Sequence, residues 1–172
     1  MKNISLIGMS GTGKTSTAQE LGLLLNDFVV VDTDELIICH EDMTIPEIFS
    51  KFGEKHFRNT ENAVIKEIFA NSKMIVSLGG GAFENAENRQ IIKENSTVIY
   101  LKSTPETIFA RLNGKNDRPL LTTDFSVEKI AKILALRDDN YKKSDIIIET
   151  DGKTPIQVAQ EITEALKDEF QS

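Results

Sequence analysis

The chain has 172 residues, of which 40% are hydrophobic and 27% are charged, a composition that predicts one globular domain and excludes a mainly disordered protein. The 27 Asp and Glu against 20 Lys and Arg give a net charge of −7, which disfavours binding to nucleic acid. No apolar run approaches the roughly 20 residues of a membrane span. The single cysteine, Cys39, cannot form an internal disulfide, which indicates a reducing compartment. We therefore expect a cytoplasmic protein with no nucleic-acid or membrane partner.

Short apolar runs alternate with longer stretches of helical spacing. Strands are expected at residues 4–7, 28–31, 74–78, 97–101 and 146–148. Helices are expected to begin after the first glycine loop, at Thr44, at Phe52, at Ser103, at residue 127 and near Val158. Apolar strands separated by helices indicate an α/β fold, with a parallel sheet covered on both faces. Ligands should then bind beyond the carboxyl ends of the strands.

The first loop matches a phosphate-binding motif in full. Residues 8–15 read Gly-Met-Ser-Gly-Thr-Gly-Lys-Thr and fit G-x-x-x-x-G-K-[ST] between a strand and a helix. Backbone N–H groups of such a loop point at a phosphate, and the helix N-terminus adds positive charge. Lys14 is expected to reach the β- and γ-phosphates, and the Thr15 hydroxyl is expected to bind Mg²⁺. The alternative is an ordinary glycine-rich turn.

Two carboxylates follow the second strand. Asp32 is placed to hold Mg²⁺-bound water, and Asp34 is placed to accept a hydroxyl proton. The alternative for Asp34 is a purely structural role, as the cap of a helix that begins near Glu35.

A glycine loop and two arginines are further candidates for binding a ligand. Gly79, Gly80 and Gly81 follow a buried strand and would allow a ligand to approach the backbone closely; the alternative is a tight turn. Arg58 and Arg137 together would hold a carboxylate, because arginine binds carboxylates through a two-pronged fork. The alternative for Arg58 is a surface ion pair with Glu54 or Glu61, one helical turn away, and that for Arg137 is a local pair with its acidic neighbours.

Four remaining residues have side chains that could take part in catalysis or metal binding. Arg118 lies in the polar stretch 113–124, which reads as a mobile loop able to cover phosphates and exclude water. His40 and His56 are too isolated to indicate a metal site. Cys39 lies beside two isoleucines and is interpreted as a small core residue rather than a nucleophile.

With these residues assembled, the chain resembles the shikimate kinase family, which has the nucleoside-monophosphate-kinase-like P-loop fold. The resemblance extends from Gly8 to Pro155. Its motifs occur in order: the phosphate loop, Asp32-Thr33-Asp34, Gly53-Glu54-x-x-Phe57-Arg58, Gly79-Gly80-Gly81, Arg118-Pro119-Leu120-Leu121, and Arg137 with Tyr141.

This resemblance implies a three-layer α/β/α fold with a five-stranded parallel sheet in the order 2-3-1-4-5. Residues 1–172 would form a single domain, with a mobile lid at about 113–125 and a substrate-binding segment at about 33–61. The implied reaction is transfer of the ATP γ-phosphate to the 3-hydroxyl of shikimate, in aromatic amino-acid synthesis. A monomer is expected, with shikimate and ATP as its partners and Mg²⁺ as its cofactor.

The resemblance also assigns roles to residues. Lys14, Asp34 and Arg118 would be catalytic, with Asp34 as the base and Arg118 on the lid. Thr15 and Asp32 would serve the metal. Shikimate would contact Asp34, Arg58, Gly79, Gly80, Gly81 and Arg137. ATP would contact Gly11, Thr12, Gly13, Lys14, Thr15, Ser16, Arg111, Arg118, Lys153 and Pro155, with Arg111 and the 153–155 segment flanking adenine.

The chain departs from the family pattern after Arg137. Asp138-Asp139-Asn140-Tyr141 stands where the family often has a segment with proline. If the two added acids point into the cleft, they would hold Arg137 away from a substrate; if they face solvent, they have little effect.

Three other functions remain as alternatives. A gluconate kinase would lack the Asp32-Thr33-Asp34 and Phe57-Arg58 patterns. A nucleotide kinase would keep the phosphate loop and make the remaining matches coincidental. A catalytically silent P-loop module should have lost Lys14, Asp34 or an arginine, and this chain keeps them.

Overall fold

The computed structural model describes residues 2–112 and 126–171. Its elements in chain order are β1 (Asn3–Ile7), α1 (Lys14–Leu24), β2 (Val29–Asp32), α2 (Thr33–Glu41), α3 (Ile45–Phe69), β3 (Met74–Ser77), the 3-10 helix η1 (Ala82–Glu84), α4 (Ala86–Asn95), β4 (Ser96–Lys102), α5 (Pro105–Leu112), α6 (Val127–Tyr141), β5 (Ile146–Glu149) and α7 (Pro155–Gln171). Arg118 and the expected lid at 113–125 lie outside the described residues.

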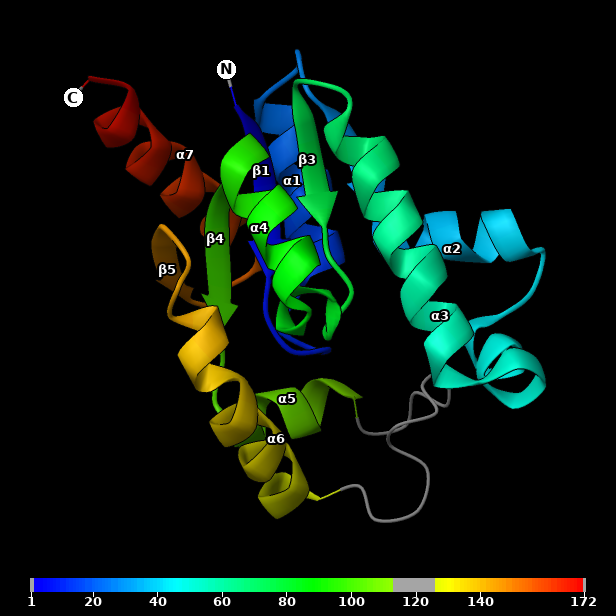
Figure 1. Cartoon of the computed structure of the whole chain (residues 1–172). Helices are drawn as coiled ribbons and strands as arrows, with labels where there is room; N and C mark the ends of the chain where they lie inside the picture. The colour runs from blue at the N-terminus through cyan, green and yellow to red at the C-terminus, as the bar shows by residue number, and fades with distance from the viewer. Residues whose placement is uncertain (1, 113–125, 172) are drawn as a thin grey trace.

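Within these residues the strands form one five-stranded parallel sheet in the order β2-β3-β1-β4-β5, which confirms the predicted fold class. The first strand, β1, lies at the centre, with Ile4 opposite Ile75 of β3 and Thr97 of β4. Parallel strands end at the same edge of a sheet, so the loops after β1, β2 and β3 open on one side of the molecule. Figure 1 shows this edge below the arrowheads of β3 and β4, where α5 and α6 also lie.

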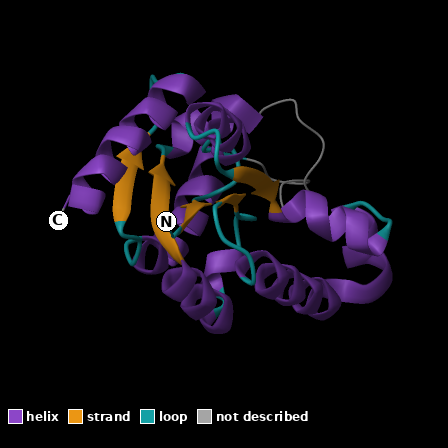
Figure 2. Cartoon of the chain, turned by 90° about the horizontal axis from the view of Figure 1, so that it is seen from above, coloured by secondary structure: helices purple, strands orange, loops and turns teal. Residues whose placement is uncertain are grey.

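Helices cover both faces of the sheet (Figure 2). Alternate residues of a strand face opposite sides, and on one side Ile4, Leu6 and Ile99 pack against α1 and α7. On the other side Val76, Val98 and Tyr100 pack against α3, α4 and the end of α6. Burial of apolar side chains on both faces therefore supports the three-layer arrangement. Among the described residues, no helix is long and apolar enough to span a bilayer.

The edge strand β2 departs from the expected pattern. Residues 28–31 form an apolar run, which predicts burial on both faces, but Val29 is 59% exposed and Val30 is 37% exposed. The strand pairs only with β3 in the described sheet, so fewer elements are available to cover it.

The long helix α3 begins as predicted and bends where the sequence predicts a separate start. Thr44 and Glu47 form a capping box at its N-terminus. At Gly53 the backbone leaves helical geometry, with φ 81° and ψ 173°, a left-handed conformation that glycine adopts without steric penalty. The expected new helix near Phe52 is therefore a kink within α3, and it redirects the residues before Gly53 relative to those that carry Arg58.

Candidate active site

One cavity of about 810 Å³ lies at the carboxyl edge of the sheet. It is lined by every sequence-predicted site residue that falls within the described part of the chain. These are Gly11, Thr12, Gly13, Lys14, Thr15, Ser16, Asp32, Asp34, Arg58, Gly79, Gly80, Gly81, Arg111, Arg137, Lys153 and Pro155. The tertiary structure thus brings together residues that are spread over more than 140 positions of the sequence.

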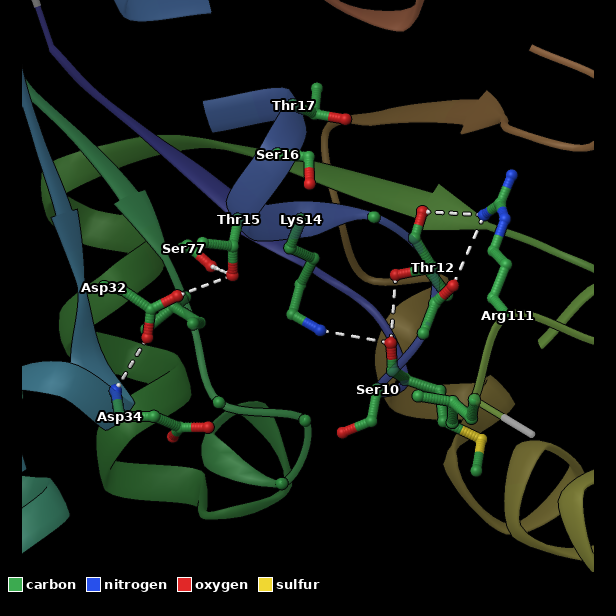
Figure 3. Close-up of a pocket in the computed structure, with 18 of the residues that line it drawn as sticks. Ser10, Thr12, Lys14, Thr15, Ser16, Thr17, Asp32, Asp34, Ser77 and Arg111 are labelled. Carbon is green, nitrogen blue, oxygen red and sulfur yellow. Dashed lines mark hydrogen bonds between the residues drawn. The ribbon is translucent and has the colours of Figure 1, made fainter. Parts of the chain in front are cut away.

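The phosphate loop forms one wall of the cavity (Figure 3). It joins the central strand β1 to the first turn of α1, so the N-terminus of that helix faces the cavity. Lys14 is only 8% exposed, and its Nζ donates to the carbonyl oxygens of Gly8 (2.9 Å) and Met9 (3.1 Å). A buried ammonium group and a helix N-terminus together make this wall attractive to a phosphate.

Arg111 connects the loop to the far end of the sheet. One guanidinium nitrogen donates to the carbonyl oxygens of Gly11 (3.3 Å) and Thr12 (3.2 Å), and the other donates to the carbonyl oxygen of Thr150 (3.0 Å). Lys153, just after β5, pairs with Glu161 of α7 at 2.5 Å. Of the predicted adenine-flanking residues, Arg111 therefore contacts the phosphate loop directly, and Lys153 and Pro155 line the same cavity.

A hydroxyl and a carboxylate meet between α1 and β2. Thr15 Oγ1 donates to Asp32 Oδ2 (2.7 Å) and lies 3.3 Å from the Ser77 hydroxyl (Figure 3). The other carboxylate oxygen, Asp32 Oδ1, accepts from the backbone N–H of Asp34 (2.9 Å) and caps α2. The helix-cap alternative for Asp34 is therefore wrong, because Asp32 performs that role. Asp34 instead lies in the first turn of α2, with its side chain against the glycine loop.

Each glycine of the 79–81 loop makes room for a different part of the site. A Cβ on Gly79 would lie 2.5 Å from Asp34 Oδ1, and one on Gly81 would lie 3.0 Å from an Arg58 nitrogen. A Cβ on Gly80 would lie 3.2 Å from the backbone nitrogen of Ser10, in the phosphate loop. The loop therefore lies in close contact with both the phosphate loop and the side chains of Asp34 and Arg58.

Arg58 faces this loop from α3 and is held there by two acids. It donates to both carboxylate oxygens of Glu61 (3.0 and 3.2 Å), and it contacts the exposed Glu54 at 3.4 Å. Glu61 is 1% exposed, so this contact is not the surface pair that the sequence offers as an alternative. Burial raises the pKa of Glu61, and the neighbouring Arg58 opposes that rise. The pair orients the guanidinium group toward the cavity.

Arg137 approaches the same loop from α6. Its Nη1 donates to the carbonyl oxygen of Gly80 at 2.8 Å. Of the two acids that follow it, Asp138 pairs with Lys142 at 2.5 Å, and Asp139 is exposed. The added acids therefore leave Arg137 at the glycine loop, and the alternative of a local pair with them is not what the structure shows.

The cavity contains residues that the sequence alone did not assign. Ser77 and Glu61 are among the polar ones. The three-residue spacing from Arg58 marks Glu61 as a partner, but not as a buried one. Apolar side chains from α2 and α3 also line the cavity, namely Ile38, Ile45, Phe49 and Phe57. Phe57 belongs to the motif that contains Arg58, whereas the spacing of Ile38, Ile45 and Phe49 indicates only a packed helix face and does not separate them from core residues.

The histidines and the cysteine lie elsewhere. His56 pairs with Glu41 at 2.9 Å and His40 with Glu67 at 3.3 Å, and no group of three or more possible His, Cys, Asp or Glu metal ligands occurs in the described residues. Cys39 is exposed, so its interpretation as a core residue is wrong. It occupies the outer face of α2, where Ile37 points inward instead.

Comparison with known proteins gives one consistent family. A family model described as shikimate kinase matches residues 10–167. Shikimate kinase of Thermodesulfovibrio yellowstonii is 41% identical over 94% of this chain and 93% of its own length, and that of Geobacter metallireducens is 38% identical over 95% and 90%. A solved structure of shikimate kinase from Acinetobacter baumannii in complex with shikimate superposes with a TM-score of 0.94, at 32% identity over 98% of this chain and 94% of that one.

The family model and these relatives cover nearly the whole chain, including both walls of the cavity. The structural match likewise covers 98% of this chain. The chain belongs to the shikimate kinase family.

Proposed function

We propose that this protein transfers the γ-phosphate of ATP to the 3-hydroxyl of shikimate, giving ADP and shikimate 3-phosphate. One observation carries the proposal: a single cavity joins a phosphate loop to a carboxylate and two arginines across one glycine loop. Family membership supports the same reaction.

In the nucleotide half of the cavity, the loop N–H groups of Gly11, Thr12 and Gly13 bind phosphate oxygens, with Ser16 close behind them on α1. Lys14 neutralises charge on the β- and γ-phosphates as it develops during transfer, a contribution of roughly 10²–10³-fold in rate. Arg111 with Lys153 and Pro155 flanks the adenine ring at the outer end of the cavity.

The adjacent Thr15 hydroxyl and Asp32 carboxylate are suitable ligands for Mg²⁺. Both contribute oxygen atoms, which this hard cation prefers, and Asp32 directs one carboxylate oxygen at the Thr15 hydroxyl. Mg²⁺ usually binds few protein ligands and takes the rest from phosphates and water, which fits a site with no larger acidic cluster among the described residues. When bound, the cation neutralises phosphate charge and orients the phosphates for in-line transfer.

In the acceptor half, Asp34 is the proposed base. The 3-hydroxyl oxygen forms a bond to the γ-phosphorus while the bond from that phosphorus to the ADP oxygen breaks, and the hydroxyl proton passes to the Asp34 carboxylate. Arg58 and Arg137 hold the substrate carboxylate from α3 and α6, beside Gly79, Gly80 and Gly81. The proton acceptor and the carboxylate clamp thus lie around one glycine loop, with Asp34 against Gly79, Arg137 against Gly80 and Arg58 against Gly81.

The apolar wall distinguishes the candidate substrates. Gluconate also carries a carboxylate and hydroxyls, so the arginines alone do not exclude it. Ile45, Phe49 and Phe57 present apolar surface in the cavity that Asp34 also lines, which complements the carbon face of a cyclohexene ring better than an open-chain polyol. This observation favours shikimate.

We further propose that residues 1–172 form a single domain that works as a cytoplasmic monomer, because one chain supplies both halves of the cavity. Residues 33–61 form its substrate-binding segment. Arg118, in the proposed lid at about 113–125, supplies a further positive charge to the phosphates. These points rest on the family resemblance and on the cavity lining.

The test is a coupled assay of ADP release, run with ATP and Mg²⁺ against shikimate, gluconate and nucleoside monophosphates. We expect turnover with shikimate, and loss of that turnover in Asp34→Asn with ATP binding retained. Turnover restricted to gluconate or to a nucleotide would replace the proposed substrate. No turnover with any acceptor, by a folded protein that binds ATP, would favour a silent P-loop module.

A further inference from the structure

The carbonyl oxygen of Gly80 accepts two hydrogen bonds from α6. Arg137 Nη1 donates to it at 2.8 Å, and the hydroxyl of Tyr141 donates to it at 2.7 Å. The two donors lie four residues apart, on one face of the helix. Arg137 belongs to the proposed carboxylate site, whereas Tyr141 lies behind it and does not line the cavity.

The surroundings of Tyr141 fix the direction of its hydroxyl group toward the glycine loop. The residue is 1% exposed, and its ring stacks on that of Tyr100 in β4, with centroids 4.8 Å apart. Stacking and burial leave the ring little freedom, so the hydroxyl keeps one direction. Burial also raises the pKa of Tyr141, and Arg137 opposes that rise; the phenol therefore stays protonated and donates at neutral pH.

The hydrogen bond has a geometric consequence for the next peptide N–H. The Gly80–Gly81 peptide is trans, so its carbonyl and its N–H point in opposite directions. With the Gly80 carbonyl turned to α6, the N–H of Gly81 is turned away from that helix. The loop after this peptide is closed by Glu84 N–H donating to the carbonyl of Gly81 at 3.1 Å.

A run of three glycines has no side chains to fix such an orientation. Glycine has the widest conformational freedom of any residue. The Ala82 N–H closes the turn by donating to the carbonyl oxygen of Gly79 at 3.0 Å, and the two bonds from α6 add the contacts that hold the Gly80 carbonyl in one direction. Arg137 alone would hold the Gly80 carbonyl poorly, because the same guanidinium group must also donate hydrogen bonds to the substrate carboxylate.

We propose that Tyr141 is a positioning residue for the substrate carboxylate. Its hydroxyl holds the Gly80 peptide so that the Gly81 N–H presents to the carboxylate, and it leaves Arg137 free to turn its remaining donors toward the ligand. The proposal rests on the proposed function and adds a residue that determines how tightly the carboxylate is held.

The test is Tyr141→Phe, which removes one oxygen and keeps the stacked ring. Tyr100→Phe is the matched control, because it removes a hydroxyl from the same ring pair and retains both donors to Gly80. Calorimetric titration measures the Kd of shikimate, and that of an analogue in which a hydroxymethyl group replaces the carboxylate, with wild type and both variants. The KM for ATP and the thermal midpoint are measured in parallel.

We expect Tyr141→Phe to weaken shikimate binding about 2- to 13-fold, the equivalent of one net hydrogen bond, with the analogue and the KM for ATP unchanged. Tyr100→Phe should bind both ligands as the wild type does. Equal weakening of both ligands, or the same selective loss in Tyr100→Phe, would show a general packing role and overturn the proposal. Unchanged shikimate affinity in Tyr141→Phe would overturn it as well.

A measurement on the wild type keeps the test independent of how the variant folds. With ¹⁵N-glycine labelling, only 10 glycine amides appear, and the Gly81 amide proton should move downfield with shikimate but not with the analogue. No such shift overturns the proposed orientation. Failure of the proposed function is distinct, because the wild type would then bind the two ligands equally or bind neither.

Discussion

Gly79→Ala tests the placement of Asp34 with a single added carbon. The new Cβ would lie 2.5 Å from Asp34 Oδ1, whereas ordinary contact begins at about 3.4 Å. Gly79 does not have a positive φ, so alanine suits its backbone. The carboxylate is the far end of a side chain, and it must therefore move by about 0.9 Å to relieve the clash.

A displacement of this size should act on the reaction rather than on the fold. Misplacing a catalytic group by about 1 Å costs roughly 10²-fold in rate, because proton acceptance depends on the geometry at the reacting hydroxyl. We therefore expect kcat to fall roughly 50- to 100-fold. The Kd of ATP should stay within about twofold of wild type, because the phosphate loop is on a separate wall. The assay is coupled ADP release with saturating shikimate, with ATP binding measured by titration.

Gly81→Ala is the matched control. Its Cβ would lie 3.0 Å from an Arg58 nitrogen, so it should raise the KM of shikimate more than it lowers kcat. The reasoning is refuted if Gly79→Ala, with an unchanged thermal midpoint, retains kcat within about threefold of wild type. The same conclusion follows if the two alanine variants have the same kinetic effect.

Three further predictions follow from the site. Lys14→Ala should lower kcat by roughly 10²–10³-fold or more, with circular dichroism unchanged, and near-normal ADP release would contradict the phosphate assignment. Arg118→Ala should lower kcat by a similar roughly 10²-fold while calorimetry finds little change in the Kd of shikimate; a large loss of affinity with normal kcat would place Arg118 at the acceptor. Burial raises the pKa of the Glu61 carboxyl above 4.5. The folded protein therefore binds this proton more tightly than the unfolded chain does. The stability that the bound proton contributes is lost as pH rises from 4.5 through the raised pKa. Glu61→Gln should lack that loss, as measured by urea unfolding from pH 4.5 to 7 against wild type; parallel pH profiles would contradict it.

Features that depend on neighbours in the sequence were predicted well. The phosphate loop spans eight consecutive residues, and the capping box of α3 spans four, so each can be recognised without knowledge of the rest of the chain. The alternation of apolar runs and helical spacing predicts the order of the elements, and the family resemblance implies the strand order that the sheet has. The residues expected at the site were also the ones that line the cavity, wherever the structure describes them.

The structure excludes one alternative and corrects two expectations of burial. Asp32 caps α2, which excludes the helix-cap alternative for Asp34, because the cap is decided by which side chain can reach the free N–H groups at the first turn. Cys39 is exposed although its neighbours are apolar, because a helix turns successive residues by about 100° and only Ile37 faces the core. Val29 is exposed because its strand lies at the edge of the sheet.

By itself, the sequence determined the chemistry of this protein: a phosphate loop, a pair of carboxylates and the arginines that suit an acidic substrate. Only the tertiary structure decided that Gly79 meets Asp34, that Gly81 meets Arg58, and that the Glu61 beside Arg58 is buried. Local motifs are set by interactions over a few residues, whereas these contacts depend on how α2, α3 and α6 pack around the end of one parallel sheet, which no short stretch of sequence encodes.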